Sequence, residues 1–351
     1  MSAIPRADRR GVQSEATRNI DPPRRILVLL VAGIGDLVLA TPALRALRET
    51  FPSAEITLLT SRKAALLATT LPIVDQVQTF ETPKSLLKSR NFLAASNQLG
   101  ALRRRSFDVL VNLYPVLSLR GSWTMRLFNR AVAARQTVGR NTDGRGTFYD
   151  RRLAETLSGN TLHEADRMLE VVRLIGATTQ QLRPQVWIPP RYARRASRWL
   201  SSGRPRVVIQ AGSQSYKRWP PERYRRLAEE IHRKWNAEIL WNGSPDERNW
   251  ITSICSPLEF ETGNLAGECD VLELSALLQR CDLLVSNDSG PMHIAAALGV
   301  PLVALFGGSN LERFDPRRTE PRSRVVAAES SNEVSLDAVI QAADELLTSG
   351  N

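Results

Sequence analysis

The run from Ser286 to His293 places small polar residues, a carboxylate and an imidazole between a short apolar segment and a helical pattern. Residues 282–285 are typical of a buried parallel strand, and 294–299 predict a helix that a glycine closes. A strand that turns directly into a helix leaves backbone N–H groups free at the positive end of the helix dipole, which favours anions. With Asp288 as an acceptor and His293 as a titratable donor, the loop predicts a site for a phosphorylated ligand.

A second loop of this kind spans residues 210–222, between a strand pattern at 206–210 and a helix that begins with proline at 221. Gly212 and Ser213 could offer backbone and hydroxyl donors to a phosphate, and Lys217 is a compact charge suited to a diphosphate. The alternative is a surface loop with incidental basic residues. Read together with the first loop, it indicates a ligand that carries a diphosphate.

A third loop, residues 31–36, follows the strand pattern at 26–30 and contains Gly33 and Gly35. Val38 stands where a dinucleotide fingerprint requires a third glycine, so the loop argues against an NAD-dependent dehydrogenase. Asp36 lies at the start of the next helix. It either points into a cleft as a reactive carboxylate or simply caps that helix.

Strand and helix patterns alternate through two successive halves of the 351 residues, and the proline-rich stretch 183–190 separates these halves. Strands that read as short continuous apolar runs predict parallel sheets with helices on both faces. We therefore expect an α/β protein with two Rossmann-like, doubly wound domains and an interdomain cleft. The expected division is a disordered extension at 1–24, an N-terminal domain at 25–183 and a C-terminal domain at 184–351.

The composition, 42% hydrophobic and 24% charged, is that of an ordinary globular protein. The three cysteines have neither a CxxC pair nor the spacing of metal ligands, which favours a reducing, cytoplasmic location and no metal site. No apolar run is long enough to span a membrane, and the polar N-terminus is not a secretory signal.

Positive charge is concentrated in one segment of a chain whose formal net charge is +11. Residues 103–152 contain eleven arginines, no lysine and three acidic residues. Such a segment attracts phosphorylated substrates, anionic membranes or nucleic acid, but the chain has no nucleic-acid recognition motif. Trp123, Leu127 and Phe128 stand among these arginines, as in a helix that lies on an anionic surface. A helix packed on a sheet with its arginines outside has the same pattern, and we favour this packing.

Three motifs together resemble those of glycosyltransferase family 9, which contains the ADP-heptose:lipopolysaccharide heptosyltransferases. They are GDLVLATPALRAL at 35–47, KRWPPER at 217–223 and NDSGPMH at 287–293, and the similarity extends over about residues 25–316. The resemblance implies a GT-B fold and inverting sugar transfer from a nucleotide sugar without a metal ion or other cofactor. It also places the N-terminal domain on the acceptor side and the C-terminal domain on the donor side.

The resemblance implies a role for each matched residue. Asp36 becomes the candidate catalytic base. The candidate donor-binding residues are Gly212, Ser213, Lys217, Asp288, Ser289, Gly290 and His293. The segment 140–151 also resembles a stretch of the acceptor-side domain, and we expect Gly35, Arg140 and Arg145 to contact the acceptor.

The implied reaction is transfer of heptose from ADP-heptose onto a hydroxyl of a lipopolysaccharide-core or related anionic glycan or glycolipid. The expected location is the cytoplasm, and a peripheral contact with the cytoplasmic face of the inner membrane stays open. Two alternatives also stay open. One is a family member that uses another nucleotide sugar or a non-lipopolysaccharide acceptor, and the more distant one is a nucleotide-binding protein that transfers nothing.

Overall fold

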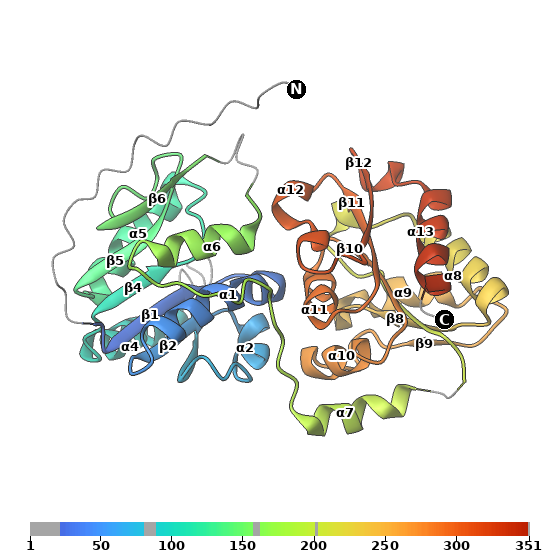
Figure 1. Ribbon diagram of the computed structural model, residues 1–351, viewed down its shortest axis with the longest axis horizontal. Helices are drawn as coiled ribbons and strands as arrows, with labels where there is room; N and C mark the ends of the chain where they lie inside the picture. Colours follow the sequence, from blue (N-terminus) through green and yellow to red (C-terminus); the bar gives the residue numbers. More distant parts are fainter. Residues whose placement is uncertain (1–21, 81–88, 157–161, 201–202, 350–351) are drawn as a thin grey trace, which may run out of the picture.

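Two α/β domains lie side by side in the computed structural model, which describes residues 22–80, 89–156, 162–200 and 203–349 (Figure 1). The first sheet has the order β3 (Gln76–Thr79), β2 (Glu55–Thr60), β1 (Arg25–Leu30), β4 (Val109–Asn112), β5 (Gln136–Thr142), β6 (Arg151–Glu155). The second has the order β12 (Arg324–Ala328), β11 (Leu302–Gly307), β10 (Leu283–Asn287), β7 (Arg206–Gln210), β8 (Glu238–Asn242), β9 (Thr262–Asn264). All neighbouring strands are parallel.

Both sheets have the same doubly wound topology, in which the first strand of the sheet lies beside the fourth. These pairs are β1 with β4 and β7 with β10. The chain leaves the two members of each pair in opposite lateral directions, which opens a crevice at their carboxyl ends. The expected α/β class with two Rossmann-like domains is confirmed. Most of the extension expected to be disordered, at 1–24, lies outside the described residues.

The helices of the first domain are α1 (Ile34–Thr50), α2 (Arg62–Ala68), α4 (Ser89–Arg104), α5 (Leu119–Val132) and α6 (Glu164–Arg173). Those that follow are α7 (Pro190–Ala196), α8 (Pro221–Trp235), α9 (Arg248–Cys255), α10 (Val271–Leu278), α11 (Gly290–Leu298), α12 (Leu311–Phe314) and α13 (Leu336–Ser349). Short 3₁₀ helices are η1 (Ser197–Trp199), η2 (Ser215–Lys217), η3 (Pro245–Glu247), η4 (Pro316–Arg318) and η5 (Ser331–Glu333). None of the helices in the described parts of the chain is both long and apolar enough to cross a membrane.

Strand β1 shows how each sheet separates two layers of helices. Ile26 and Val28 join the core that contains α1, α2 and α6, whereas Leu27 and Leu29 join a separate core beneath α4 and α5. This alternation follows from the two-residue repeat of a strand. Helices α4 and α5 therefore cover the sheet face opposite α1.

One hydrophobic core is continuous across the domain boundary. Leu37 and Val38 of α1 belong to the same buried cluster as Met292 and Ile294 of α11. Figure 1 shows α1 and α11 facing each other between the two sheets. Because apolar burial is the main favourable term in folding, this contact stabilises one arrangement of the two domains.

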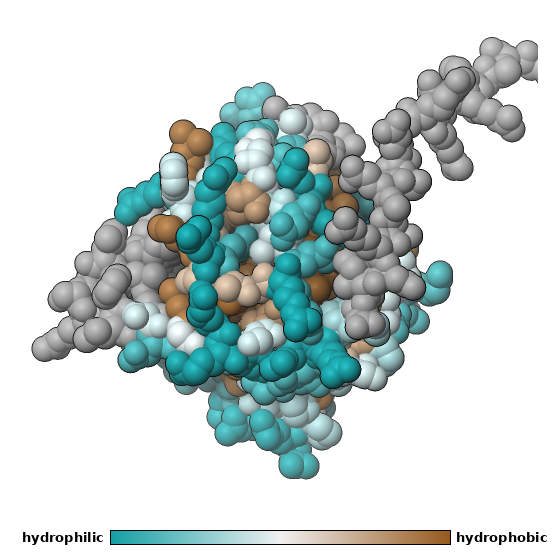
Figure 2. Space-filling view, turned by 90° about the vertical axis from the view of Figure 1, so that its left-hand side faces the viewer, coloured by the Kyte–Doolittle hydropathy of each residue, from teal (hydrophilic) through white to brown (hydrophobic). Residues whose placement is uncertain are grey.

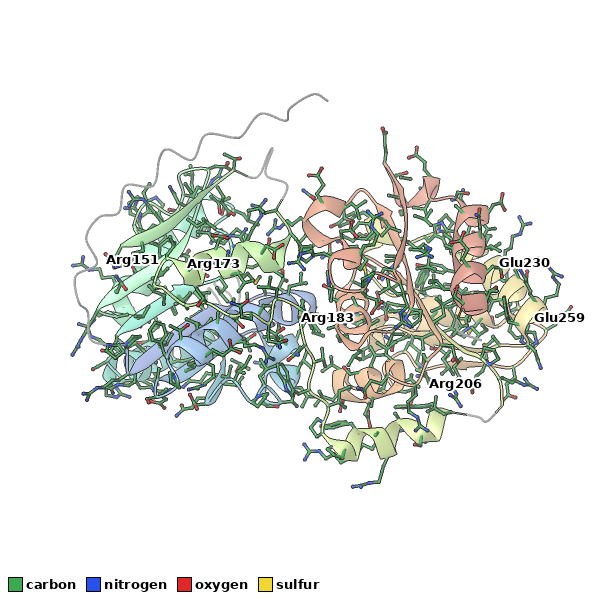
Figure 3. The ribbon with its side chains drawn as sticks, in the orientation of Figure 1. Arg151, Arg173, Arg183, Arg206, Glu230 and Glu259 are labelled. Carbon is green, nitrogen blue, oxygen red and sulfur yellow. The ribbon has the colours of Figure 1, made fainter. Side chains whose placement is uncertain are left out.

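The connection between the sheets is also held by polar contacts. Arg183, labelled at the junction of the domains in Figure 3, pairs with Glu320 at 3.0 Å and donates to the carbonyl of Ala296 at 3.3 Å. Two residues further on, the backbone N–H of Gln185 donates to Oγ1 of Thr41 in α1 at 2.9 Å. The crossing segment is thus hydrogen-bonded to both domains before α7 begins.

Two glycines allow a close approach of the two domains. A Cβ atom added to Gly35 would lie 2.6 Å from Cδ2 of His293, and one added to Gly290 would lie 3.2 Å from Cβ of Ile34. Side chains larger than hydrogen at these two positions would hold the N-termini of α1 and α11 apart.

Gly35→Ala is therefore expected to destabilise the protein. The ring of His293 is 5% exposed, so it cannot yield without repacking, and overpacking of this kind costs about 1–3 kcal/mol. The measurement is the urea midpoint of unfolding. Gly100→Ala in α4 is the matched control, because the nearest atom to its added methyl group is a flexible guanidinium nitrogen of Arg104 at 3.5 Å. Equal midpoints for the two variants would show that the interface tolerates the methyl group.

Candidate active site

The loops that follow β7 and β10 meet at the crevice of the second domain. Lys217, at the end of η2, lies with its Nζ 2.6 Å from Oδ2 of Asp288. Both side chains are largely buried, with exposed fractions of 18% for Lys217 and 7% for Asp288. The structure thus brings together two charged residues that are 71 positions apart, and removal of either would leave the other without its partner.

Buried hydrogen bonds fix the relative position of these two loops. Asn287, the last residue of β10, donates from Nδ2 to the carbonyl of Ala211 at 3.2 Å. Its Oδ1 accepts a hydrogen bond from the hydroxyl of Tyr224 in α8 at 2.9 Å. Because both ends of the Asn287 amide are hydrogen-bonded, Asp288 is held beside the loop that carries Lys217.

The N-terminus of α11 faces the same place. Ser289 is its N-cap, in an extended conformation with φ −154° and ψ 169°, and its side chain makes no capping hydrogen bond. The N–H groups of Ser289, Gly290 and Met292 have no acceptor within the helix, because the first turn of a helix offers none. Backbone donors and the helix dipole therefore combine into an anion site next to Lys217.

His293 lies beneath this site as a neutral imidazole at pH 7. Burial lowers its pKa to about 4, although the nearby charge of Asp288 opposes the shift. Its Nε2 is 4.0 Å from Oδ1 of Asp288. Since the ring is uncharged at neutral pH, it offers a hydrogen bond and not a positive charge.

Gly212 and Ser213 lie in a loop that packs against the loop after β8. A Cβ atom on Gly212 would meet Oε2 of Glu247 at 2.1 Å, so only glycine fits there. Arg218 connects the two loops, since it donates to the carbonyl of Ser213 at 2.9 Å and to Oε1 of Glu247 at 2.9 Å. The half-buried Ser213 is therefore held close to the Lys217 loop.

Asp36, in the first turn of α1, caps that helix. Its Oδ2 accepts a hydrogen bond from the backbone N–H of Gly33 at 3.0 Å, which closes the first turn and starts the helix at Ile34. Burial raises the pKa of this carboxyl, and the charges of Glu164 and Asp288 raise it further. The Gly33 N–H and Arg313 act in the opposite direction. Asp36 is thus a capping carboxylate that also faces charged groups of the second domain.

The structure corrects the expectation for Arg140. This residue is fully buried in β5, and its guanidinium forms a bidentate pair with Glu155 at 2.9 and 2.8 Å. The remaining nitrogen pairs with Glu164, and Glu155 also accepts from Arg167 at 2.9 Å. With its charge enclosed by two carboxylates, Arg140 does not offer a cation to an anionic acceptor at the surface. It positions Glu164 instead.

Glu164 connects this buried network to the second domain, and sequence reasoning missed it. Its Oε2 accepts from Nε of Arg313 in α12 at 2.6 Å. Burial alone would raise the pKa of Glu164, but Arg140 and Arg313 lower it overall, so it stays ionised. The only signal in the sequence was a carboxylate at the start of the helix after His163, and none marked Arg313.

The two remaining acceptor-side candidates differ in position. Gly35 contacts His293 across the interface, as described above, so its place is explained by the packing of two helices. Arg145 lies in the turn between β5 and β6, half exposed, and pairs with Asp143 at 2.8 Å. Arg145 therefore stays a candidate contact for an acceptor.

Within the described ranges, no group of three or more His, Cys, Asp and Glu side chains is arranged to hold a metal ion. Two cationic side chains near the crevice are Lys217, which pairs with Asp288, and Arg313, which pairs with Glu164.

Comparison with known proteins identifies relatives of this chain. The family model described as glycosyltransferase family 9 (heptosyltransferase) matches residues 99–339. The lipopolysaccharide core heptosyltransferase OpsX of Haemophilus influenzae is 24% identical over 311 residues, which cover 86% of this chain and 82% of that protein. Lipopolysaccharide heptosyltransferase 2 of Escherichia coli is 27% identical over 309 residues, which cover 83% and 85%.

Solved structures agree in fold. The E. coli ADP-heptose lipopolysaccharide heptosyltransferase II has a TM-score of 0.75 at 22% identity, covering 93% of this chain and 99% of that one. A more distant neighbour, TibC, is described as a dodecameric iron-containing heptosyltransferase in complex with ADP-D-β-D-heptose, with a TM-score of 0.54 and 12% identity. These likenesses show a shared GT-B architecture.

Arg313→Gln is expected to raise the pKa of Asp36, because it removes a cation that favours the carboxylate. The titration of the Asp36 carboxyl carbon can be followed by carbon NMR, with Asp36→Asn identifying the resonance. Arg318→Gln is the matched control: it breaks another interdomain pair, with Asp166 at 2.8 Å, but Arg318 is not among the groups that shift Asp36. An equal titration of Asp36 in both variants would contradict the assignment.

Proposed function

Because this chain belongs to glycosyltransferase family 9, it is a glycosyltransferase, and we propose that it transfers heptose from ADP-heptose onto a hydroxyl of a lipopolysaccharide-core acceptor. The relatives that cover most of its length are lipopolysaccharide heptosyltransferases. The observation that carries the proposal for the site is the close approach of the N-terminus of α1, which carries Asp36, to the N-terminus of α11, next to the Lys217–Asp288 pair.

We propose that Asp36 is the catalytic base. In an inverting transfer, the acceptor hydroxyl attacks the anomeric carbon opposite the leaving group while its proton passes to the base. The new glycosidic bond forms as the bond to the nucleoside diphosphate breaks. Burial raises the pKa of Asp36, which strengthens it as a base, and general base catalysis contributes about 10²–10⁴-fold. The Gly33 N–H holds Oδ2 and so orients the carboxylate.

The second domain would bind the donor through its diphosphate. Lys217, the hydroxyl of Ser213 and the N–H groups of Ser289 and Gly290 surround one anion site, where fixed donors stabilise the charge that develops on the leaving group. Asp288 holds Lys217 in place before the diphosphate arrives. The neutral ring of His293 would donate a hydrogen bond to a phosphate or to the ribose, and Gly212 keeps the loop close to its neighbour.

On the acceptor side we propose that Arg145 contacts an anionic group of the glycan and that Gly35, at the domain interface, lies against the acceptor. Arg140 would contribute only indirectly, through Glu164.

We further propose that the enzyme works in the cytoplasm, in peripheral contact with the inner membrane that carries a glycolipid acceptor. We propose that Lys217 and the N-terminus of α11 supply the donors for the diphosphate without a metal ion, so transfer should persist after treatment with a chelator. Loss of transfer upon chelation, and its recovery with added iron, would instead indicate a metal requirement like that implied for TibC.

Binding of nucleoside diphosphates tests the donor directly. We expect ADP to raise the melting temperature more than GDP, UDP, CDP or TDP, because binding to the native state stabilises it by mass action. A larger shift with a different nucleotide would agree with a glycosyltransferase but contradict ADP-heptose as the donor. It would favour the alternative in which the donor is another nucleotide sugar. If none of the nucleotides changed the melting temperature, the proposed diphosphate site would be contradicted. ADP binding without transfer to any glycan would favour a nucleotide-binding protein that transfers nothing.

Two substitutions separate the base from the donor site. Asp36→Asn should lower kcat about 10²–10⁴-fold and leave the Kd for the donor nearly unchanged, since Asn keeps the capping acceptor but cannot take a proton. Lys217→Ala should weaken donor binding by about 10- to 100-fold, as expected for a lost charged hydrogen bond. Isothermal titration with ADP and steady-state kinetics measure the two effects. An equal loss of ADP binding in both variants would contradict the base assignment.

A further inference from the structure

Helix α5 packs on the sheet with its arginines outside, as favoured from the sequence, but it also presents apolar side chains to solvent. Leu119, Trp123 and Leu127 are 74%, 68% and 65% exposed, and Leu117 just before the helix is 48% exposed. Only the opposite side of the helix, with Phe128 and Val132, packs onto the sheet. A spacing of four residues places Leu119, Trp123 and Leu127 on one face.

The same face is basic. Arg120, Arg126 and Arg130 are exposed and lie between the apolar residues around the helix. Arg126 stacks on Trp123 with its guanidinium carbon 5.9 Å from the ring centroid. No acidic residue occurs between Asp108 and Asp143. Helix α5 itself therefore carries no carboxylate to neutralise these arginines.

Helix α5 is also connected to the candidate active site. Tyr114 follows β4 and lies near enough to Asp36 that, besides burial, the charge of Asp36 raises the pKa of the Tyr114 phenol. Leu119 lies five positions after Tyr114, which is at most about 18 Å of extended chain. The first turn of α5 also contacts the Arg145 turn, because the hydroxyl of Ser122 donates to the carbonyl of Arg145 at 2.7 Å.

We propose that this face of α5, formed by Leu117, Leu119, Arg120, Trp123, Arg126, Leu127 and Arg130, docks onto an anionic lipid bilayer. Apolar and aromatic side chains interleaved with arginines fit the boundary between acyl chains and anionic headgroups. Figure 2 views the first domain from its outer end, and apolar side chains lie there among long hydrophilic ones. The proposal rests on the proposed function for the acceptor: a glycolipid in that bilayer would present its sugars close to Asp36.

Vesicle co-sedimentation of the full chain tests the proposal. Wild-type protein should bind vesicles of phosphatidylcholine with phosphatidylglycerol, bind pure phosphatidylcholine weakly, and be released by salt. Trp123→Ser with Leu127→Ser should lower the partition coefficient on the order of tenfold. Arg120→Ser with Arg130→Ser should lower it about 30-fold, from the contribution expected of two arginines near an anionic surface.

Matched controls remove the same residue types elsewhere. Leu66→Ser replaces an exposed leucine of α2 (37% exposed), and Arg225→Ser with Arg226→Ser removes two charges from α8. Neither control should change vesicle binding. Equal losses of vesicle binding for the α5 arginine pair and the α8 pair would show that binding depends only on net charge, and this would overturn the proposal. Unchanged vesicle binding of the Trp123 and Leu127 variant would overturn it as well.

Two further readouts separate this proposal from its rivals. Sedimentation velocity without vesicles would overturn it if wild-type protein were a dimer that Trp123→Ser with Leu127→Ser converts to a monomer, since the face would then join two copies. Transfer to a delipidated, water-soluble acceptor should be unaffected by the α5 variants. Vesicle binding without any transfer would contradict the proposed function alone, and transfer without vesicle binding would contradict only the docking surface.

Discussion

The N-termini of α1 and α11 approach each other across the two domains at Gly35 and Gly290, and this contact brings the two halves of the site together. Each helix contributes the positive end of its dipole. Acidic residues lie at these ends, Asp36 within the first turn of α1 and Asp288 just before the cap of α11. In our proposal, the free N–H groups at the start of α11 bind the diphosphate, and Asp36 at the start of α1 acts as the base beside it.

The buried ionic network gives this arrangement a defined electrostatic state. Glu164 is enclosed between Arg140 of its own domain and Arg313 of the other. Removing one member of such a network would leave a buried charge unpaired, so the network favours a specific pairing of the domains more than it adds net stability. The network also affects the pKa of Asp36, because Glu164 raises this pKa while Arg313 lowers it. The chemistry at Asp36 therefore depends on residues that make no contact with a sugar in our proposal.

The arginines of the basic segment at 103–152 lie in two different environments. Arg140 turns inward and is neutralised, whereas the arginines of α5 stay outside among exposed apolar side chains. The expected packing of α5 on the sheet with its arginines outside agrees with the structure, but Phe128 alone of the three marked apolar residues fills the space against the sheet, while Trp123 and Leu127 stay exposed. The same basic segment thus contributes a buried arginine to the core and, in our proposal, an exposed surface that binds anionic lipid.

The sequence by itself determined the doubly wound class and the loops around Asp36, Lys217 and Asp288, because alternation of strands and helices and the small polar residues at their junctions are local signals. It could not decide which arginine is buried, since the partners of Arg140 lie 15 and 24 residues away and are brought close only by pairing of β5 with β6 and by packing of α6. It gave no sign of Arg313, which reaches Glu164 over 149 residues. Only the tertiary structure decided these pairings, because a charge is neutralised by what lies beside it in space, whatever its distance along the chain.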